Sequence, residues 1–231
     1  MGLNTLQQYY LQKMGVDIYL PRDVVVDDVI YPEAVTNKEH DSGIETPDWE
    51  NLKKQVASCT RCELHKGRTQ TVFGVGDVNA DWLIIGEAPG RDEDLQGEPF
   101  VGRAGKLLNS MLRAIGLQRE QVYIANILKC RPPNNRDPAQ EEVASCEGYL
   151  RQQIAMINPK IIIAVGRIAA QNLLKVDTPI GKMRGNRFEY PGSNIPVVVT
   201  YHPAYLLRSP REKRKVWQDL QMAVKTYNSV K

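Results

Sequence analysis

The chain has 231 residues, of which 42% are hydrophobic and 25% charged, a composition typical of a globular protein and unlike that of a fibrous or disordered one. This length allows one core of substantial size but not two ordinary domains with a linker. No apolar run approaches the length that spans a bilayer, and the N-terminus lacks the basic and continuous apolar regions of an export signal, so we expect a cytoplasmic protein that does not bind membranes.

The formal net charge of +3 conceals two parts of opposite charge. Residues 1–50 contain three Lys or Arg and ten Asp or Glu, whereas residues 51–231 contain 27 and 17. A basic folded domain can attract a polyanion and release counterions from its phosphates. Charge alone is equally compatible with a surface that only keeps the protein dissolved.

The first fifty residues differ from the rest in pattern as well as in charge. Residues 21–50 combine acidic residues and turn formers without a sustained helical period, which predicts an extended linker. Before it, Leu3, Leu6, Tyr10 and Leu11 could line one face of a short helix. This helix would pack weakly on the protein's own domain or dock a protein partner. We therefore predict an acidic N-terminal extension and linker (1–50) and one folded domain (51–231).

In the basic part, short apolar runs of the strand type alternate with helical patterns. The strand-like runs are residues 81–86, 122–128, 160–166 and 196–202. Helices are expected over residues 103–116, from an N-cap at Asp137 with Pro138 at the first position, over 167–175, and near 212–227. Four strand–helix units in series predict an α/β protein with three α/β/α layers and a central, mostly parallel four-stranded sheet.

Open sheets of this kind bind ligands beyond the carboxyl ends of their strands. The four predicted strand ends carry the turn Gly86–Gly90, Asn126, Gly166 and His202. Asn126 is the most informative, because a buried amide must find partners and can accept from one group while donating to another. Phe100 would ordinarily be a core residue, but its flanking glycines and charges favour a pocket wall. Neither a G-x-G-x-x-G nor a G-x-x-x-x-G-K-[ST] motif is present, which disfavours a nucleotide cofactor.

The four cysteines are a candidate metal site. Cys59 and Cys62 form a C-x-x-C pair, a spacing that lets two thiolates reach one metal centre. Cys130 and Cys146 supply two further ligands, and thiols remain reduced in the cytoplasm, so ligands are favoured over disulfides. Spacing alone decides neither for zinc nor for a cluster, and four unrelated buried cysteines are the remaining alternative.

Two motifs identify a family that the chain resembles. GEAPGRDED, residues 86–94, resembles the first motif of the thermostable iron-sulfur uracil-DNA glycosylases, family 4 of the uracil-DNA glycosylase superfamily. HPAYLL, residues 202–207, resembles the second motif. Phe100, Asn126 and the four cysteines follow the family's order at similar separations. The resemblance covers about residues 52–225 and leaves residues 1–50 without a counterpart.

The resemblance implies a hydrolase of base-excision repair that flips uracil out of single- or double-stranded DNA and cleaves its N-glycosidic bond, leaving an abasic site. Phe100 would stack on the base and Asn126 would read its N3–H and O4 edge. Glu87, Asn126 and His202 are the expected catalytic residues. The expected uracil-binding set is Gly86, Glu87, Ala88, Glu93, Phe100, Asn126 and His202.

Individual roles follow from the resemblance. Ala88 stands where better-known uracil glycosylases carry an Asp that positions water, so Glu87 is the candidate for that task, with a structural role as the alternative. Glu93 would close the pocket against the 5-methyl group of thymine, or else be a solvated carboxylate. Cys59, Cys62, Cys130 and Cys146 would ligate a [4Fe-4S] cluster rather than zinc, in a structural role.

The expected DNA contacts lie in two segments. Arg131 and Arg136, in the loop between Cys130 and Cys146, and Arg208 and Arg211, in the basic run after the second motif, would face phosphates. Leu206 would wedge into the gap that the flipped base leaves, or be a buried structural leucine. The KRRIH insertion of a related, DNA-crosslinking branch is absent from the sequence, so ordinary turnover is expected. We expect a monomer.

The main alternative is a non-catalytic nucleic-acid-binding module that keeps the fold and carries zinc or a cluster. Its binding to DNA would not depend on uracil. A second alternative is an accessory domain that the acidic extension recruits to a DNA polymerase, with glycosylase activity secondary or lost. Deletion of residues 1–50 should abolish recruitment under this alternative, whereas excision should persist if the protein is a glycosylase.

Overall fold

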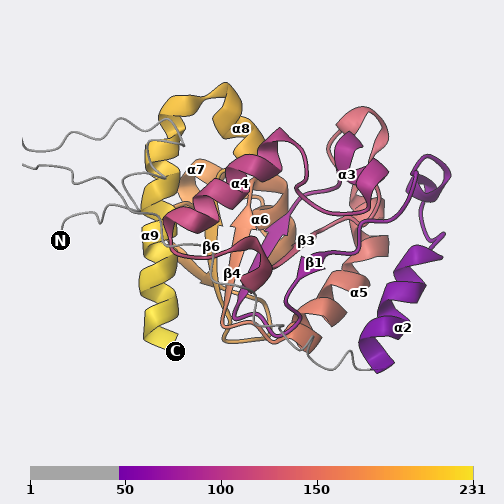
Figure 1. Ribbon diagram of the computed structural model, residues 1–231, viewed down its shortest axis with the longest axis horizontal. Helices are drawn as coiled ribbons and strands as arrows, with labels where there is room; N and C mark the ends of the chain where they lie inside the picture. The colour runs from indigo at the N-terminus through magenta and orange to yellow at the C-terminus, as the bar shows by residue number, and fades with distance from the viewer. Residues whose placement is uncertain (1–46, 231) are drawn as a thin grey trace, which may run out of the picture.

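A computed structural model describes residues 47–230 (Figure 1). The predicted short helix near the N-terminus and the linker up to residue 46 lie outside the described residues. Helix α2 (Pro47–Ala57) spans the expected division at residue 50, and the side chains of Trp49 and Leu52 are buried against the folded domain.

The sheet has six strands in the described part of the chain, in the order β1-β3-β2-β4-β6-β5. The four predicted apolar runs form its parallel centre, as β2 (Trp82–Gly86), β3 (Tyr123–Asn126), β4 (Ile161–Val165) and β6 (Pro196–Thr200). Antiparallel strands β1 (Val75–Gly76) and β5 (Arg187–Glu189) add one edge each. The mostly parallel α/β sheet is confirmed.

The predicted number of four strands was wrong because both edge strands lack an apolar run. Strand β1 has two residues, and strand β5 consists of Arg187, Phe188 and Glu189 with the two charged side chains exposed. Edge strands that are short and charged resist pairing with other chains, so their sequences carry little of the usual strand signal.

Helices cover both faces of the sheet, because successive strand side chains point to opposite faces. Leu83 and Ile85 pack in the core beneath α2, α5 (Gln140–Ile157) and α6 (Arg167–Leu174). Trp82 and Ile84 pack in the opposite core beneath α4 (Arg103–Ala114) and α9 (Lys213–Val230). Figure 1 shows α9 and α2 at opposite sides of the molecule. The three predicted layers are therefore present.

The remaining elements are short. They are α3 (Arg91–Gln96), α7 (Ile180–Met183), α8 (Pro203–Arg208) and the 3-10 turns η1 (Glu63–Lys66), η2 (Arg119–Gln121), η3 (Pro133–Asn135) and η4 (Pro210–Glu212). No helix in residues 47–230 is long and apolar enough to cross a membrane.

The predicted N-cap at Asp137 was wrong. Helix α5 begins at Gln140, and the N–H of Ala139 donates to the Glu142 carboxylate at 2.8 Å. The Asp137 carboxylate instead accepts from Arg167 at 2.6 Å. A side chain engaged in an ion pair with another element is not free to cap the helix that follows it.

Candidate active site and cysteine site

A cavity of about 440 Å³ opens beyond the carboxyl ends of the parallel strands. Strand ends meet there because β2 and β3 pair in parallel with Gly86 beside Asn126. The cavity brings together side chains from five segments, lined by Glu87, Ala88, Pro89, Gly90, Glu93, Phe100, Ala104, Asn126, Pro132, Asn135, Arg136, Asp137, His202, Ala204, Tyr205 and Arg208. Six of the seven predicted uracil-binding residues are among them.

The seventh, Gly86, lies directly against two of the others. A Cβ atom at Gly86 would stand 2.5 Å from Asn126 Oδ1 and 2.7 Å from the Phe100 ring. Any side chain at this position would therefore push apart the amide and the aromatic ring. Phe100 is 6% exposed, and its ring lies 5.5 Å from the His202 ring at an interplanar angle of 29°.

Asn126 ends strand β3 with an unusual hydrogen-bonding state. The residue is 2% exposed, its backbone carbonyl accepts from Lys129 Nζ at 3.0 Å, and its side-chain oxygen Oδ1 is buried without a hydrogen-bond partner. A buried acceptor that remains unpaired costs about 1–3 kcal/mol, so such atoms in native proteins have a reason. An N–H group of a ligand in the cavity would satisfy it.

His202 caps helix α8 and is held in one tautomer. Its Nδ1 accepts from the Ala204 N–H at 3.1 Å, so the neutral ring carries its proton on Nε2. Burial lowers the pKa of His202 to about 4, and the nearby Arg208 charge adds to the effect. The ring is therefore a neutral hydrogen-bond donor at physiological pH.

Glu87 presents the carboxyl group in the cavity whose pKa is most displaced. The pKa of Glu87 is raised to about 7. Burial is the main cause, the Asp137 carboxylate contributes in the same direction, and the Arg167 charge lowers the pKa. Perturbed carboxyl groups of this kind are candidates for proton transfer or for holding water.

Glu93 makes more contacts than the resemblance suggested. Its Oε2 accepts from the N–H of Gly90 at 3.1 Å, and its Oε1 accepts from the N–H groups of Val101 and Gly102 at 3.0 and 3.2 Å. The carboxylate thus joins the turn after β2 to the loop that carries Phe100. Glu93 lines the cavity as an organiser of its walls.

The predicted DNA contacts in the long loop are engaged inside the protein. Arg136 makes a two-pronged pair with Glu142, at 2.9 and 2.6 Å, and lines the cavity. Arg131 donates to Asn135 Oδ1 at 2.7 Å. Both arginines therefore shape the loop between the second pair of cysteines.

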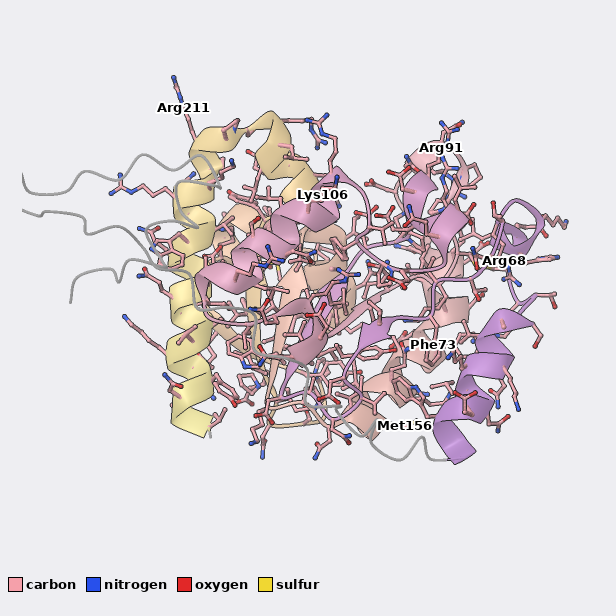
Figure 2. All side chains as sticks on the ribbon, in the orientation of Figure 1. Arg68, Phe73, Arg91, Lys106, Met156 and Arg211 are labelled. Carbon is pink, nitrogen blue, oxygen red and sulfur yellow. The ribbon has the colours of Figure 1, made fainter. Side chains whose placement is uncertain are left out.

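Helix α8 turns one of its leucines inward. Leu206 is 1% exposed and packs in the core with Phe100 and the residues of α4, whereas Tyr205 and Leu207 are 36% and 38% exposed. In this conformation Leu206 has the buried structural position that was the alternative to a wedge. Arg208 and Arg211 are exposed, and Arg211 projects from the upper side of the molecule in Figure 2, where Lys106 and Arg91 also lie.

The four cysteines line one hollow, together with residues of α2, η1 and α5 and the segment that follows β3. Several donors point at their sulfur atoms. Arg68 donates to Cys130 Sγ at 3.1 Å, and the N–H of Lys129 donates to Cys146 Sγ at 3.3 Å. Burial opposes ionisation of Cys59, but hydrogen bonds from Tyr149 and Arg61 lower its pKa. Burial raises the pKa values of Cys130 and Cys146, and the donors from Arg68 and Lys129 offset part of that effect.

The arrangement of the sulfurs bears on which group they fit. Within residues 47–230, no three His, Cys, Asp or Glu side chains are close enough to hold one metal ion. A zinc ion binds sulfur at about 2.3 Å and requires its four ligands close together. The four cysteines nevertheless line one common hollow, and their thiols are of the kind that ligate a metal ion or an iron-sulfur cluster.

One residue that sequence reasoning missed joins the two sites. Lys129 is 1% exposed, and its ammonium group donates to the Asn126 carbonyl and to Gln153 Oε1 at 3.0 and 2.6 Å. Burial lowers the pKa of Lys129 to about 8. The signal in the sequence was a lysine at the end of an apolar run, between Asn126 and Cys130.

Comparisons with known proteins agree with the geometry. The family described as the uracil DNA glycosylase superfamily matches residues 73–221. The chain is 48% identical over 178 residues to the type-4 uracil-DNA glycosylase of Archaeoglobus fulgidus, covering 74% of this chain and 89% of that protein. It is 45% identical over 177 residues to the type-4 enzyme of Thermotoga maritima, covering 75% and 92%.

A third relative, the type-4 uracil-DNA glycosylase of Sulfurisphaera tokodaii, is 43% identical over 179 residues, which are 74% of this chain and 81% of that protein. The matched region contains the cavity and the parallel strands. The chain belongs to the type-4 uracil-DNA glycosylases of the uracil-DNA glycosylase superfamily.

Proposed function

We propose that this protein excises uracil from DNA by hydrolysing the N-glycosidic bond, as a monofunctional glycosylase of base-excision repair. The observation that carries the proposal is the buried, unpaired Oδ1 of Asn126, beside Phe100 in the strand-end cavity. Uracil offers an N3–H donor next to the O4 acceptor, and an amide side chain can pair with both. Cytosine has no hydrogen on N3.

Binding requires that the nucleotide leave the DNA stack, at a cost of a few kcal/mol. Phe100 provides an aromatic wall for the flipped base, and Gly86 lets the Asn126 amide and the Phe100 ring lie close together because it has no side chain. The backbone near Glu87 and Ala88 provides donors for O2 of the base.

Catalysis would depend on a hydrogen bond donated by the uncharged His202 ring. As the bond between N1 and the sugar breaks, the sugar gains positive charge and uracil leaves as an anion with charge on O2. The Nε2–H of His202 is present because Nδ1 accepts from Ala204, and it would donate to O2 without transferring a full charge. Donors that meet developing charge in a buried site are usually the largest catalytic contribution.

Glu87 is proposed to hold the water molecule that attacks the sugar. In its ionised form the carboxylate accepts a hydrogen bond from that water and stabilises the positive sugar. Because its pKa is raised to about 7, the Glu87 carboxyl group changes from the protonated to the ionised form near neutral pH.

The cysteine site is proposed to hold a [4Fe-4S] cluster ligated by Cys59, Cys62, Cys130 and Cys146. Such a cluster would cross-link α2 and η1 to α5 and to the end of β3. The donors to sulfur from Arg68, Lys129 and Tyr149 support the anionic charge of four thiolates. Its role here is structural.

The DNA face is proposed to be the edge of the sheet where the cavity opens. Arg208 and Arg211 lie exposed at this edge, and Arg91 and Lys106 extend it across α3 and α4 (Figure 2). Arg131 and Arg136 hold the loop that borders it, and Leu206 supports α8 from below. The protein is proposed to act as a monomer, with residues 1–50 as the segment for a protein partner.

An oligonucleotide with one uracil, end-labelled and treated with alkali after incubation, tests the proposal. We expect cleavage only at uracil, and none in matched oligonucleotides with cytosine or thymine at that position. A visible absorption spectrum of the same anaerobic preparation should show a broad iron-sulfur band. Binding to DNA without cleavage, independent of uracil, would instead indicate a non-catalytic module.

A further inference from the structure

Phe100 has a backbone conformation that a large side chain rarely adopts. Its φ is +54°, in the left-handed region, and the residue is neither Gly nor Asn. Such conformations are unfavourable and persist only where the surrounding structure holds them, most often at functional sites. The residues that hold Phe100 are therefore as important as the ring itself.

The peptide groups after Phe100 are held by Glu93, which accepts from the N–H groups of Val101 and Gly102. Arg119, which follows helix α4 in the turn η2, binds the carbonyl of the peptide group before Phe100 and that of the peptide group after it. Arg119 Nη2 donates to the Pro99 carbonyl at 2.6 Å, and Nη1 donates to the Phe100 carbonyl at 3.3 Å. The loop is thus held on both sides of the strained residue by one anion and one cation.

Helix α4 closes the remaining space around the same carbonyl. A Cβ atom at Gly105 would stand 1.7 Å from the Phe100 carbonyl oxygen, so the first turn of the helix lies directly against it. Nη1 of Arg119 also donates to Asn109 Oδ1 on α4 at 3.3 Å. Arg119 therefore ties the Phe100 carbonyl to the helix that it touches.

We propose that Arg119 is a positioning residue for base binding: through its bonds to the carbonyls of Pro99 and Phe100, it keeps the Phe100 ring oriented as a wall of the cavity. The guanidinium does not touch the base. Its donors are directed at three oxygens within the protein, a different task from pairing with DNA phosphates. This inference rests on the proposed stacking of the flipped uracil on Phe100.

A double-mutant cycle tests it. Phe100→Ala, Arg119→Ala and the double variant are compared in single-turnover excision of uracil, with Arg119→Lys as the conservative variant. Arg113→Ala, which removes an exposed arginine from the end of α4, is the matched control. Thermal unfolding and the absorption spectrum of each protein show whether the fold and the cysteine site are intact.

We expect Arg119→Ala to lower kcat/KM about 10- to 100-fold, because small misplacements of a binding wall have effects of this size. It should weaken inhibition by free uracil while affinity for uracil-free DNA stays unchanged. In the Phe100→Ala background the same substitution should add less than about twofold, since a group that acts through the ring has no effect without it. Arg119→Lys should recover part of the loss, and Arg113→Ala should match the wild type.

Four results would overturn the inference. If Arg119→Ala lowers kcat/KM by the same factor in the Phe100→Ala background as in the wild type, Arg119 does not act through the Phe100 ring. A loss of affinity for uracil-free DNA would assign it to phosphate binding, and wild-type kinetics would remove any role. If Phe100→Ala itself excises uracil at the wild-type rate, the stacking role of Phe100 fails together with the inference, whereas the other results leave that role standing.

Discussion

The cavity and the cysteine site are joined by one short segment, residues 126–130, but their polar atoms are prepared in opposite ways. In the cavity, Asn126 Oδ1 is buried without a partner and His202 is kept neutral with a free Nε2–H. In the cysteine site, the sulfurs of Cys130 and Cys146 already accept N–H donors. The difference fits the proposed roles of the two sites, a ligand that is bound and released in the first and a cluster that stays bound in the second.

The connection between the two sites is expected to act mainly in one direction, from the cysteine site to the cavity. Lys129 donates through its backbone to Cys146 and through its side chain to the Asn126 carbonyl. Damage to the cysteine site should therefore displace Asn126. Loss of a cavity side chain should leave the cysteines in place, because their donors come from other residues.

The largest effect is expected from Cys146→Ala. Loss of a ligand should release the bound group, lower the melting temperature by about 10 °C or more and reduce excision in parallel, since metal binding energy is part of folding energy. Ser145→Ala, which lines the same hollow, is the control. Calorimetry and the absorption spectrum measure the effect, and a Cys146→Ala protein with wild-type stability would contradict a structural role for the group.

His202→Ala should act only on the cavity. We expect single-turnover excision to fall about 10²- to 10³-fold, the usual cost of one donor to a developing anion. The absorption spectrum and affinity for uracil-free DNA should be those of the wild type. If the spectrum changed as well, the two sites would be coupled in both directions and the comparison above would fail.

Two glycines within helices allow the effect of packing near the cavity to be distinguished from the effect of helix propensity. Gly105→Ala would place a methyl group against the Phe100 carbonyl, whereas Gly148 in α5 has no atom within 4 Å of an added Cβ. We expect Gly105→Ala to destabilise the protein by about 1–3 kcal/mol and to impair excision. Gly148→Ala should stabilise it by up to about 1 kcal/mol. Urea unfolding measures both, and equal effects would contradict the close approach at Gly105.

The smallest effect concerns pH. If the Glu87 carboxylate holds water, the rate should rise with pH through a midpoint near 7, because the ionised fraction grows as pH passes its pKa. His202, with a pKa of about 4, stays neutral over this range and adds no inflection. Glu87→Gln should flatten the profile of single-turnover rate between about pH 5.5 and 8.5. If the rate of Glu87→Gln still rose with pH as in the wild type, the pH dependence would belong to another group.

The sequence predicted the parts of this site that depend on regular structure. Apolar runs fixed four parallel strands, and because such strands end at one edge, Asn126 and His202 had to meet there. The sequence could not show which side of so short a helix as α8 faces the core. It therefore did not reveal that Leu206 is buried while Leu207 is exposed. Nor did it reveal the left-handed Phe100, whose carbonyl accepts a hydrogen bond from Arg119 beyond the next helix.

The most direct test of the account is Asn126→Leu, measured for both stability and excision. An apolar side chain of similar size removes the buried, unpaired oxygen from the free protein, so the melting temperature should be unchanged or higher. Excision of uracil should fall at least about 100-fold, because the N3–H of the base loses its acceptor. A variant that loses stability and activity together would show that Asn126 is a structural residue already satisfied in the free protein, and would contradict its assignment as the residue that reads uracil.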